Sequence, residues 1–175
     1  MSGFDVRLGW YGMYKHILIP TDGSVLSNIA IEHGIALAKA LGVKITALTV
    51  SEPFYVSAFE PRIVEQYRKH VAALAAKHLD TAKNVASALD VACELVRVEH
   101  ELPYRAIIDT ATERGCDLIV MASHGRRGIS AILLGSETLK VLTHSTIPVI
   151  VCRRPHVTTL IQDSFASLSV PKMLM

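Results

Sequence analysis

Apolar residues form two kinds of pattern that alternate along the chain. Short apolar or alternating runs, typical of strands under a layer of helices, occupy residues 16–20, 43–50, 92–98, 117–121 and 147–152. Longer segments with apolar residues at helical spacing occupy residues 25–41, 62–89, 103–113 and 136–144. This alternation predicts a single doubly wound α/β domain, in which a five-stranded parallel sheet carries helices on both faces.

Two of the predicted helices have ends marked by residues with a specific backbone preference. Gly42 ends the first helix, in which the residues at helical spacing are Ile29, Ala30, His33, Leu37 and Leu41. Pro103 suits the first turn of the third helix. The side chains expected to point inward from that helix are Ile107, Ile108 and Ala111.

Length and composition support this class and limit the expected partners. A chain of 175 residues fits one domain, and half of its residues are hydrophobic while only 6% are aromatic. The formal net charge of +2 is nearly balanced, so we expect neither nucleic acid nor a membrane as a partner. No apolar run reaches the ~18 residues of a membrane span, and the N-terminus lacks the apolar core of a signal peptide, so we expect a cytoplasmic protein.

Two terminal segments fall outside the alternating pattern. Residues 1–13 are expected to be an N-terminal extension, with Met13 as an alternative biological start, and residues 14–154 to be the domain. Residues 155–175 are expected to be a tail, either frayed and polar or with one apolar helical face. That face would be lined by Leu160, Ile161, Phe165 and Leu168.

The three cysteines, Cys93, Cys116 and Cys152, show no close-paired spacing. They lie in or beside predicted strands, so buried reduced thiols are expected rather than disulfides or a metal site. The histidines show no ligand spacing such as His-x-x-x-His, and we assign no metal site.

A glycine-rich basic loop follows the fourth predicted strand. It comprises Met121, Ala122, Ser123, His124, Gly125, Arg126, Arg127 and Gly128, and Gly135 and Ser136 then open a helix. Glycines let backbone N–H groups face a ligand, and a helix N-terminus adds N–H donors and a positive dipole end. The pattern favours phosphate binding, although it is neither a Walker loop nor a Rossmann fingerprint. The alternative is a pair of ordinary turn glycines with Ser136 as the helix N-cap.

Individual polar residues of this region each allow two interpretations. Asp22 either accepts ribose hydroxyls or holds magnesium, or it caps the following helix in competition with Ser24. His124 has no acid or nucleophile beside it in sequence, which favours a conformational or phosphate-contacting role over a catalytic one. Arg126 and Arg127 either hold the distal phosphates or are solvated loop charges.

Position in the predicted sheet relates these motifs to one another. In doubly wound sheets a ligand binds beyond the carboxyl ends of the strands, where the chain order reverses. The first strand ends in Pro20, Thr21 and Asp22, and the fourth ends in the glycine loop. If these strands are neighbours, both motifs flank one crevice.

The last strand presents an apolar edge. Pro148 tolerates an edge position best, and residues 147–151 (Ile147, Pro148, Val149, Ile150 and Val151) carry no charge. Proteins rarely leave such an edge open, so we expect a homodimer formed through this strand.

Taken together, the motifs resemble those of the universal stress protein family over residues 14–153. The resemblance lies in residues 17–24 (ILIPTDGS) with Ser27 and Ala30, in residues 117–128 (DLIVMASHGRRG), in residues 133–136 (LLGS), and in residues 147–151 (IPVIV). It implies the strand order 3-2-1-4-5, dimerisation through the fifth strand, and a cytoplasmic role in stress tolerance.

One branch of that family binds ATP through Gly-x2-Gly-x9-Gly followed by Ser or Thr. Gly125, Gly135 and Ser136 fit this pattern, whereas Ala122 stands where the first glycine is expected. The resemblance implies that Pro20, Thr21 and Asp22 meet the adenosine and that the Val50 backbone faces the adenine. It implies that ribose and phosphates are surrounded by Met121, Ala122, Ser123, His124, Gly125, Gly128, Gly135, Ser136 and Glu137.

Three functions are consistent with these residues. The first is an ATP-binding stress regulator with little or no turnover; the second is a slow ATP hydrolase or self-phosphorylating enzyme. The third is a nucleotide-free dimeric adaptor. A phospho-receiver domain is excluded, because Glu99, His100 and Glu101 do not supply its acid cluster.

Overall fold

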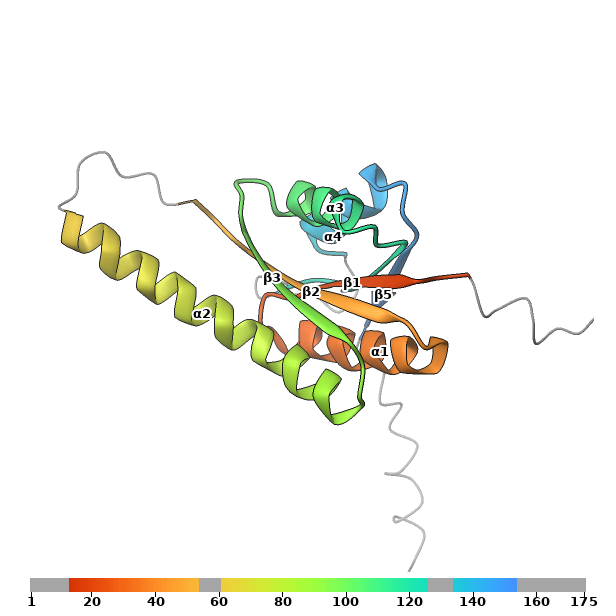
Figure 1. The fold of residues 1–175 in the computed structure, drawn as a ribbon. Helices are drawn as coiled ribbons and strands as arrows, with labels where there is room; N and C mark the ends of the chain where they lie inside the picture. Colours follow the sequence, from red (N-terminus) through yellow and green to blue (C-terminus); the bar gives the residue numbers. More distant parts are fainter. Residues whose placement is uncertain (1–12, 54–60, 126–133, 154–175) are drawn as a thin grey trace, which may run out of the picture.

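A five-stranded parallel sheet with the order β3-β2-β1-β4-β5 lies at the centre of the molecule (Figure 1). The structure is a computed structural model that describes residues 13–53, 61–125 and 134–153. Its elements are β1 (His16–Pro20), α1 (Val25–Leu41), β2 (Lys44–Ser51), α2 (Pro61–Ala88), β3 (Cys93–Glu99), α3 (Pro103–Glu113), β4 (Leu118–Ala122), α4 (Ser136–His144) and β5 (Val149–Cys152). The predicted fold class and strand order are confirmed.

Helices cover both faces of the sheet, with α1 and α2 on one side and α3 and α4 on the other (Figure 1). Each layer has its own apolar core. One contains Ile17, Ile19 and the inner faces of α1 and α2, and the other contains Leu18 and Ile119 below α3 and α4. The central strands β1 and β4 are buried along their whole length, as their continuous apolar runs predict.

The spacing of Ile29, Ala30, His33, Leu37 and Leu41 marked only part of the buried face of α1, because Ala30 is buried whereas Ile29 and Leu37 are partly buried. Its buried residues are Leu26, Ser27, Ala30, Ile31, Gly34, Ile35 and Ala38, and His33 is exposed. A Cβ at Gly34 would lie 2.6 Å from Ile19 Cδ1. The helix therefore packs on the sheet through a face that combines Leu26, Ile31 and Ile35 with the small residues Ala30, Gly34 and Ala38.

Several predicted ends agree closely with the structure. Gly42 caps α1 in the left-handed conformation at φ 68°, and Pro103 is the first residue of α3. The fifth strand begins at Val149, two positions later than predicted, with Ile147 and Pro148 in the preceding turn.

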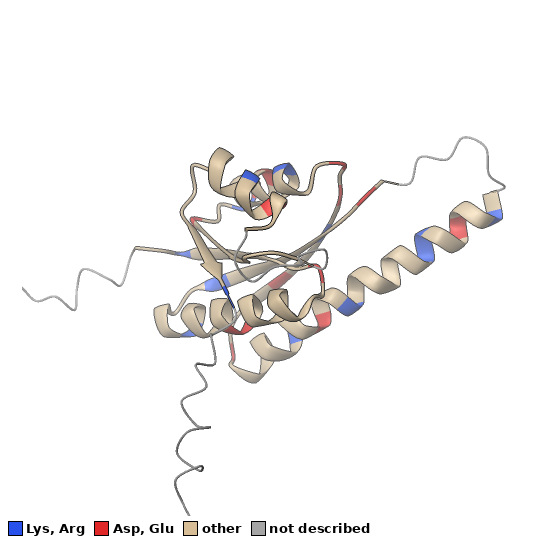
Figure 2. Ribbon diagram, turned by 180° about the vertical axis from the view of Figure 1, so that it is seen from behind, with Lys and Arg blue, Asp and Glu red and all other residues tan. Residues whose placement is uncertain are grey.

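Only the C-terminal half of α2 is packed on the domain. Its buried residues are Ala75, Leu79, Ala82 and Ala86, and the half that begins at Pro61 extends beyond the sheet (Figure 1). Positions of Lys, Arg, Asp and Glu residues are spread along this helix (Figure 2). Among the described residues, no helix is both long and apolar enough to cross a membrane.

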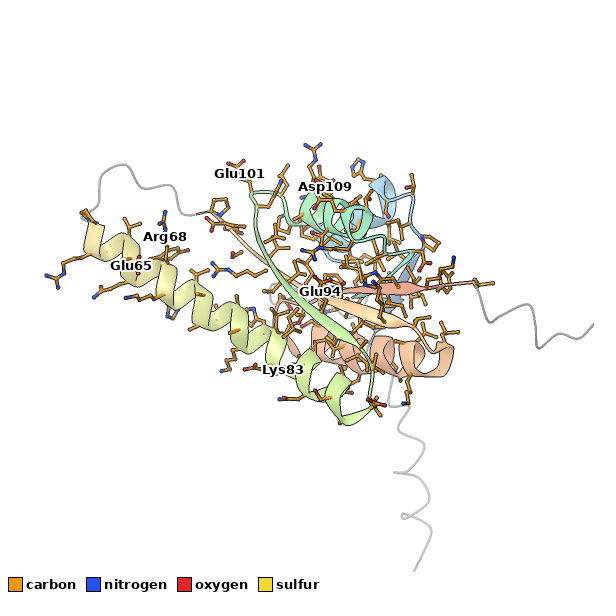
Figure 3. The ribbon with its side chains drawn as sticks, in the orientation of Figure 1. Glu65, Arg68, Lys83, Glu94, Glu101 and Asp109 are labelled. Carbon is orange, nitrogen blue, oxygen red and sulfur yellow. The ribbon has the colours of Figure 1, made fainter. Side chains whose placement is uncertain are left out.

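A polar network closes the amino end of the sheet. The Asp117 carboxylate accepts hydrogen bonds from the backbone N–H groups of Lys15 and His16, at 2.9 to 3.1 Å. The His16 ring, 3% exposed, bonds the Arg114 carbonyl at 3.1 Å and Thr46 Oγ1 at 2.8 Å. Glu94 of β3 (Figure 3) forms an ion pair with Arg114. Asp117, His16 and Glu94 therefore all have bonding partners at this end of the sheet.

All three cysteines are free thiols, as predicted, with Cys116 and Cys152 buried and Cys93 partly buried. Burial raises the pKa of each thiol, and that of Cys116 reaches about 11. These side chains are packing residues of the two cores.

Candidate functional site

A cleft of about 860 Å³ opens at the carboxyl ends of β1, β2 and β4. Its floor is formed by strand ends that include Pro20, Leu48 and Met121. The loops after β1 and β4 and residues of α2 and α3 also line it. Since β1 pairs with both β2 and β4, the cleft lies where the chain order reverses. The crevice expected between the two motifs is therefore present.

The loop between β1 and α1 is held by its own side chains. Thr21 Oγ1 donates to Ser27 Oγ at 3.1 Å and accepts from Gly23 N at 3.2 Å. Ser24 is the N-cap of α1 and accepts from Ser27 N at 3.1 Å. Asp22 does not cap the helix, because its Oδ1 accepts from Ser24 N at 3.0 Å within the loop. Of the two candidate caps, Ser24 takes the role, and Asp22 lines the cleft.

The loop after β4 approaches α4 closely through glycine. Gly135 N donates to the Ser123 carbonyl at 2.8 Å, and a Cβ at Gly135 would lie only 3.0 Å from His124 Cα and Cβ. Gly135 has an ordinary φ of −63°, so this position requires glycine for close approach and not for a left-handed conformation. At Gly125 a Cβ would overlap the Asp22 carboxylate. The loops after β1 and β4 therefore touch.

Three helices, α1, α3 and α4, begin at the cleft, and their N-termini are not alike. Ser24 caps α1, and the Glu137 carboxylate accepts from Tyr104 N at the start of α3, at 2.8 Å. The N-cap of α4 is Gly135, which has no capping side chain, and Ser136 is the first helical residue, so it is not the N-cap that the alternative interpretation assigned to it. Within the described part of the chain, no side chain accepts from the first N–H groups of α4. This helix end is therefore open to an anion in the cleft.

Glu137 lines the cleft, but its carboxylate is already bonded on both sides. One oxygen accepts from Tyr104 N, and the other forms an ion pair with Lys140 Nζ at 2.8 Å. The Lys140 ammonium also lies 5.3 Å from the centre of the Tyr104 ring. Glu137 thus joins α3 to α4, and Lys140 adds a cation to the cleft that the sequence interpretation missed.

A second wall of the cleft comes from α2 and was also missed. It consists of Tyr67, Val71, Leu74, Ala75 and His78. Their spacing of three and four residues places them on one face of the helix, and this was the signal that could have found them. Glu101, in the turn between β3 and α3 (Figure 3), lies on the opposite rim of the cleft.

Most of the predicted site residues meet at this cleft. Those that line it are Pro20, Thr21, Asp22, Val50, Met121, Ala122, His124, Gly125, Gly135, Ser136 and Glu137. Ser123 is buried instead, with its hydroxyl 3.1 Å from His124 Nδ1. Arg126, Arg127 and Gly128 lie outside the described residues. No cluster of three metal-ligating side chains occurs within the described ranges.

The far edge of the sheet carries exposed apolar side chains. Ile150 of β5 is 42% exposed, and Leu139 and Leu142 on the adjacent α4 are 54% and 40% exposed. Ile150 lies within the apolar edge predicted from residues 147–151, on the strand that ends the sheet.

Comparison with known proteins gives a consistent result. The model of the universal stress protein family matches residues 13–153. A universal stress protein of Methanocaldococcus jannaschii is 32% identical over 147 residues, which cover 82% of this chain and 84% of that protein. The solved universal stress protein UspA of Lactobacillus plantarum is 25% identical, with a TM-score of 0.68, and the match covers 80% of this chain and 98% of that one.

Two solved structures of the same fold hold adenine nucleotides. A universal stress protein in complex with cAMP is 24% identical, with a TM-score of 0.61 and coverage of 81% of this chain and 98% of that one. A universal stress protein family protein of Arabidopsis thaliana with AMP bound is 19% identical, with a TM-score of 0.61 and coverage of 81% and 93%. At these identities the likeness shows a shared fold.

Proposed function

Because the chain belongs to the universal stress protein family, we propose that it binds an adenine nucleotide, ATP, in the cleft described above. We further propose that it acts as a cytoplasmic stress-response regulator with little or no turnover. The observation that carries the nucleotide proposal is the open N-terminus of α4 beside Gly125 and Gly135, in a cleft where the N-termini of α1 and α3 have side-chain acceptors. Phosphate is the ligand that such a helix end favours.

The cleft offers a distinct place for each part of the nucleotide. The phosphates would lie against Gly125, Gly135 and Ser136, with Lys140 as an additional cation. Asp22, in contact with the Gly125 position, would meet the ribose or a magnesium ion bound to the phosphates. The adenine would lie at the ends of β1 and β2, between Pro20 and the Val50 backbone.

Low turnover follows from the groups near the expected phosphates. The loop has no Walker lysine, and Asp22 and His124 are the candidates there for activating water. His124 Nδ1 lies 3.1 Å from the Ser123 hydroxyl, and Asp22 Oδ1 is bonded to Ser24 N. Both side chains are held by the protein, which suits binding better than proton transfer.

The test begins with mass analysis of nucleotide released from the purified, heat-denatured protein. It continues with calorimetric titration of ATP, AMP and cAMP in magnesium buffer and an assay of phosphate release. Bound ATP with negligible phosphate release supports the regulator, and steady release identifies an ATPase. An absence of co-purified nucleotide, together with no heat of binding for any of the three, would overturn the nucleotide proposal and favour the adaptor.

The partner we propose is a second copy of the chain, paired through β5. Ile150 is exposed on this edge, whereas Val149 packs against the core below α3 and α4. Ile150→Lys should therefore shift sedimentation toward the monomer without unfolding the domain. Leu95→Lys, at a 40% exposed leucine on the opposite edge strand β3, is the matched control. Dimers that persist in Ile150→Lys would rule this interface out.

A further inference from the structure

Two glycines, one in the loop after β1 and one in the loop after β4, each make room for a side chain from another element. A Cβ on Gly23 would overlap the His78 ring of α2 and would lie 2.8 Å from its Nε2 and 3.0 Å from its Cγ. A Cβ on Gly125 would overlap the Asp22 carboxylate. Since Asp22 and Gly23 are adjacent, these contacts form one chain: from α2 through the β1–α1 loop to the loop after β4.

His78 is well placed to fix the β1–α1 loop. Its ring packs on the Gly23 backbone, and its Nδ1 lies 3.4 Å from Thr49 Oγ1 on β2. Gly23 has a φ of +75°, a conformation in which a glycine can move unless something packs on it. Thr21 and Ser24, which flank the Asp22–Gly23 pair, are tied by hydrogen bonds to the loop itself and to the start of α1. His78 adds a contact from outside the loop.

We infer that His78 is a positioning residue for the nucleotide site, which holds the β1–α1 loop so that the Asp22 carboxylate stays against the Gly125 loop. This inference rests on the proposed function. It gives α2, which lies outside the glycine motifs, a role in nucleotide binding. Because His78 also lines the cleft, the alternative is that its ring touches the nucleotide directly, and the experiment separates the two.

The first measurement tests the His78 contact without any ligand. Gly23→Ala should lower the urea midpoint of unfolding by more than Gly115→Ala does. Gly115 has a similar φ of +66°, but nothing lies within 4 Å of an added Cβ there, so that variant reports backbone strain alone. In a His78→Ala background the excess effect of Gly23→Ala should disappear. If Gly23→Ala and Gly115→Ala lower the urea midpoint equally in the wild-type background, the His78 ring does not pack on Gly23 and the inference fails.

The second measurement tests the positioning role through a double-mutant cycle on ATP affinity. His78→Ala should weaken binding by about tenfold in the wild type and by about twofold or less in an Asp22→Ala background, since the histidine acts through Asp22. His78→Phe, which keeps a flat ring on Gly23, should retain most of the ATP affinity that His78→Ala loses. His70→Ala, at an exposed histidine on the same helix, should leave it unchanged.

The outcomes distinguish this inference from the function on which it rests. Equal losses in both backgrounds would mean that His78 contacts the nucleotide itself and would overturn the positioning role. Unchanged affinity in His78→Ala, with a wild type that binds ATP, would overturn the inference and leave the proposed function standing. A wild type with no affinity for any adenine nucleotide would overturn both.

Discussion

The two ends of the sheet are built from the same strands but treat their polar groups in opposite ways. At the amino end, the Asp117 carboxylate accepts hydrogen bonds from the backbone N–H groups of Lys15 and His16. The His16 ring bonds the Arg114 carbonyl and Thr46 Oγ1. At the carboxyl end, Gly125 and Gly135 leave the backbone without side chains. The first turn of α4 has no side-chain cap within the described residues. The polar groups named at the amino end all have partners, whereas the carboxyl end leaves the N-terminus of α4 without a capping side chain.

This difference indicates how the molecule divides stability and binding between its two ends. A polar group that already has a buried partner contributes to the folded state and has little to offer a ligand. A helix end without a cap lowers stability slightly and retains its donors for an anion. We therefore expect mutations at the amino end to change the free energy of unfolding, and mutations at the carboxyl end to change nucleotide affinity.

The largest effect is expected for Gly135→Val and Gly125→Val. A branched side chain would collide with His124 at one position and with Asp22 at the other, and would block the approach of phosphate to the backbone. Calorimetry should show ATP affinity reduced by about a hundredfold or more, on the order of 3 kcal/mol. Gly42→Ala, where an added Cβ meets nothing within 4 Å, is the control. If both valine variants bind ATP as the wild type does, the phosphates lie elsewhere.

The next effect concerns the opposite end of the sheet. Asp117→Ala removes the acceptor of two backbone N–H groups and should lower the free energy of unfolding by about 2 kcal/mol in urea titrations. Asp117→Asn keeps one acceptor oxygen and should cost less. Nucleotide affinity should be unchanged in both variants, and a loss of affinity comparable to that of the glycine variants would break the division proposed here.

Ala122 gives a smaller effect at the carboxyl end. It ends β4, lines the cleft, and accepts a hydrogen bond from Thr138 Oγ1 of α4 at 3.0 Å. If its methyl group crowds the nucleotide, Ala122→Gly should tighten ATP binding by about tenfold or less, because one crowded methyl costs on the order of 1 kcal/mol. Wild type and variant are titrated side by side. Tight binding by the wild type with no gain in the variant would show that alanine is tolerated here.

The smallest effect is a pH dependence at the amino end. Burial and the nearby Lys44 ammonium lower the pKa of His16, while Glu94, Asp117 and the Arg114 carbonyl oppose them. The unfolded chain then binds more protons than the folded one, so the contribution of neutral His16 is present above a pH of about 6.5 and is lost as the pH falls. Urea unfolding between pH 5 and 8 should show a shallower pH dependence for His16→Gln. If the free energy of unfolding changes equally with pH in the wild type and in His16→Gln, His16 is not the source of the pH dependence.

Much of the fold follows from the sequence because periodicity and glycine positions are local signals. The runs at β1 and β4 indicated buried central strands, and Gly42 and Pro103 marked helix ends where the structure has them. The face of α1 could not be found in this way, since the contact of Gly34 with Ile19 depends on the sheet below. Small residues do not stand out in an apolar pattern.

For the candidate site, the motifs after β1 and β4 could be identified from the sequence, but the side chains that α2 and α3 contribute to the cleft could not. The spacing of Tyr67, Val71 and His78 shows a stripe on α2 but not which element it faces. Similarly, Glu137 and Lys140 are an obvious pair three residues apart, whereas the bond from Glu137 to Tyr104 N requires that α3 and α4 be neighbours. Contacts between elements distant in sequence carry no local signal.

The burial of the cysteines has a consequence for oxidation chemistry. Peroxides and disulfides react with the thiolate form of cysteine. With a pKa of about 11, roughly one Cys116 side chain in ten thousand is ionised at pH 7 in the folded protein. Because Cys116 is also 5% exposed, we expect its oxidation to proceed mainly when the core around it opens, and the rate of its modification by an alkylating reagent should report that opening.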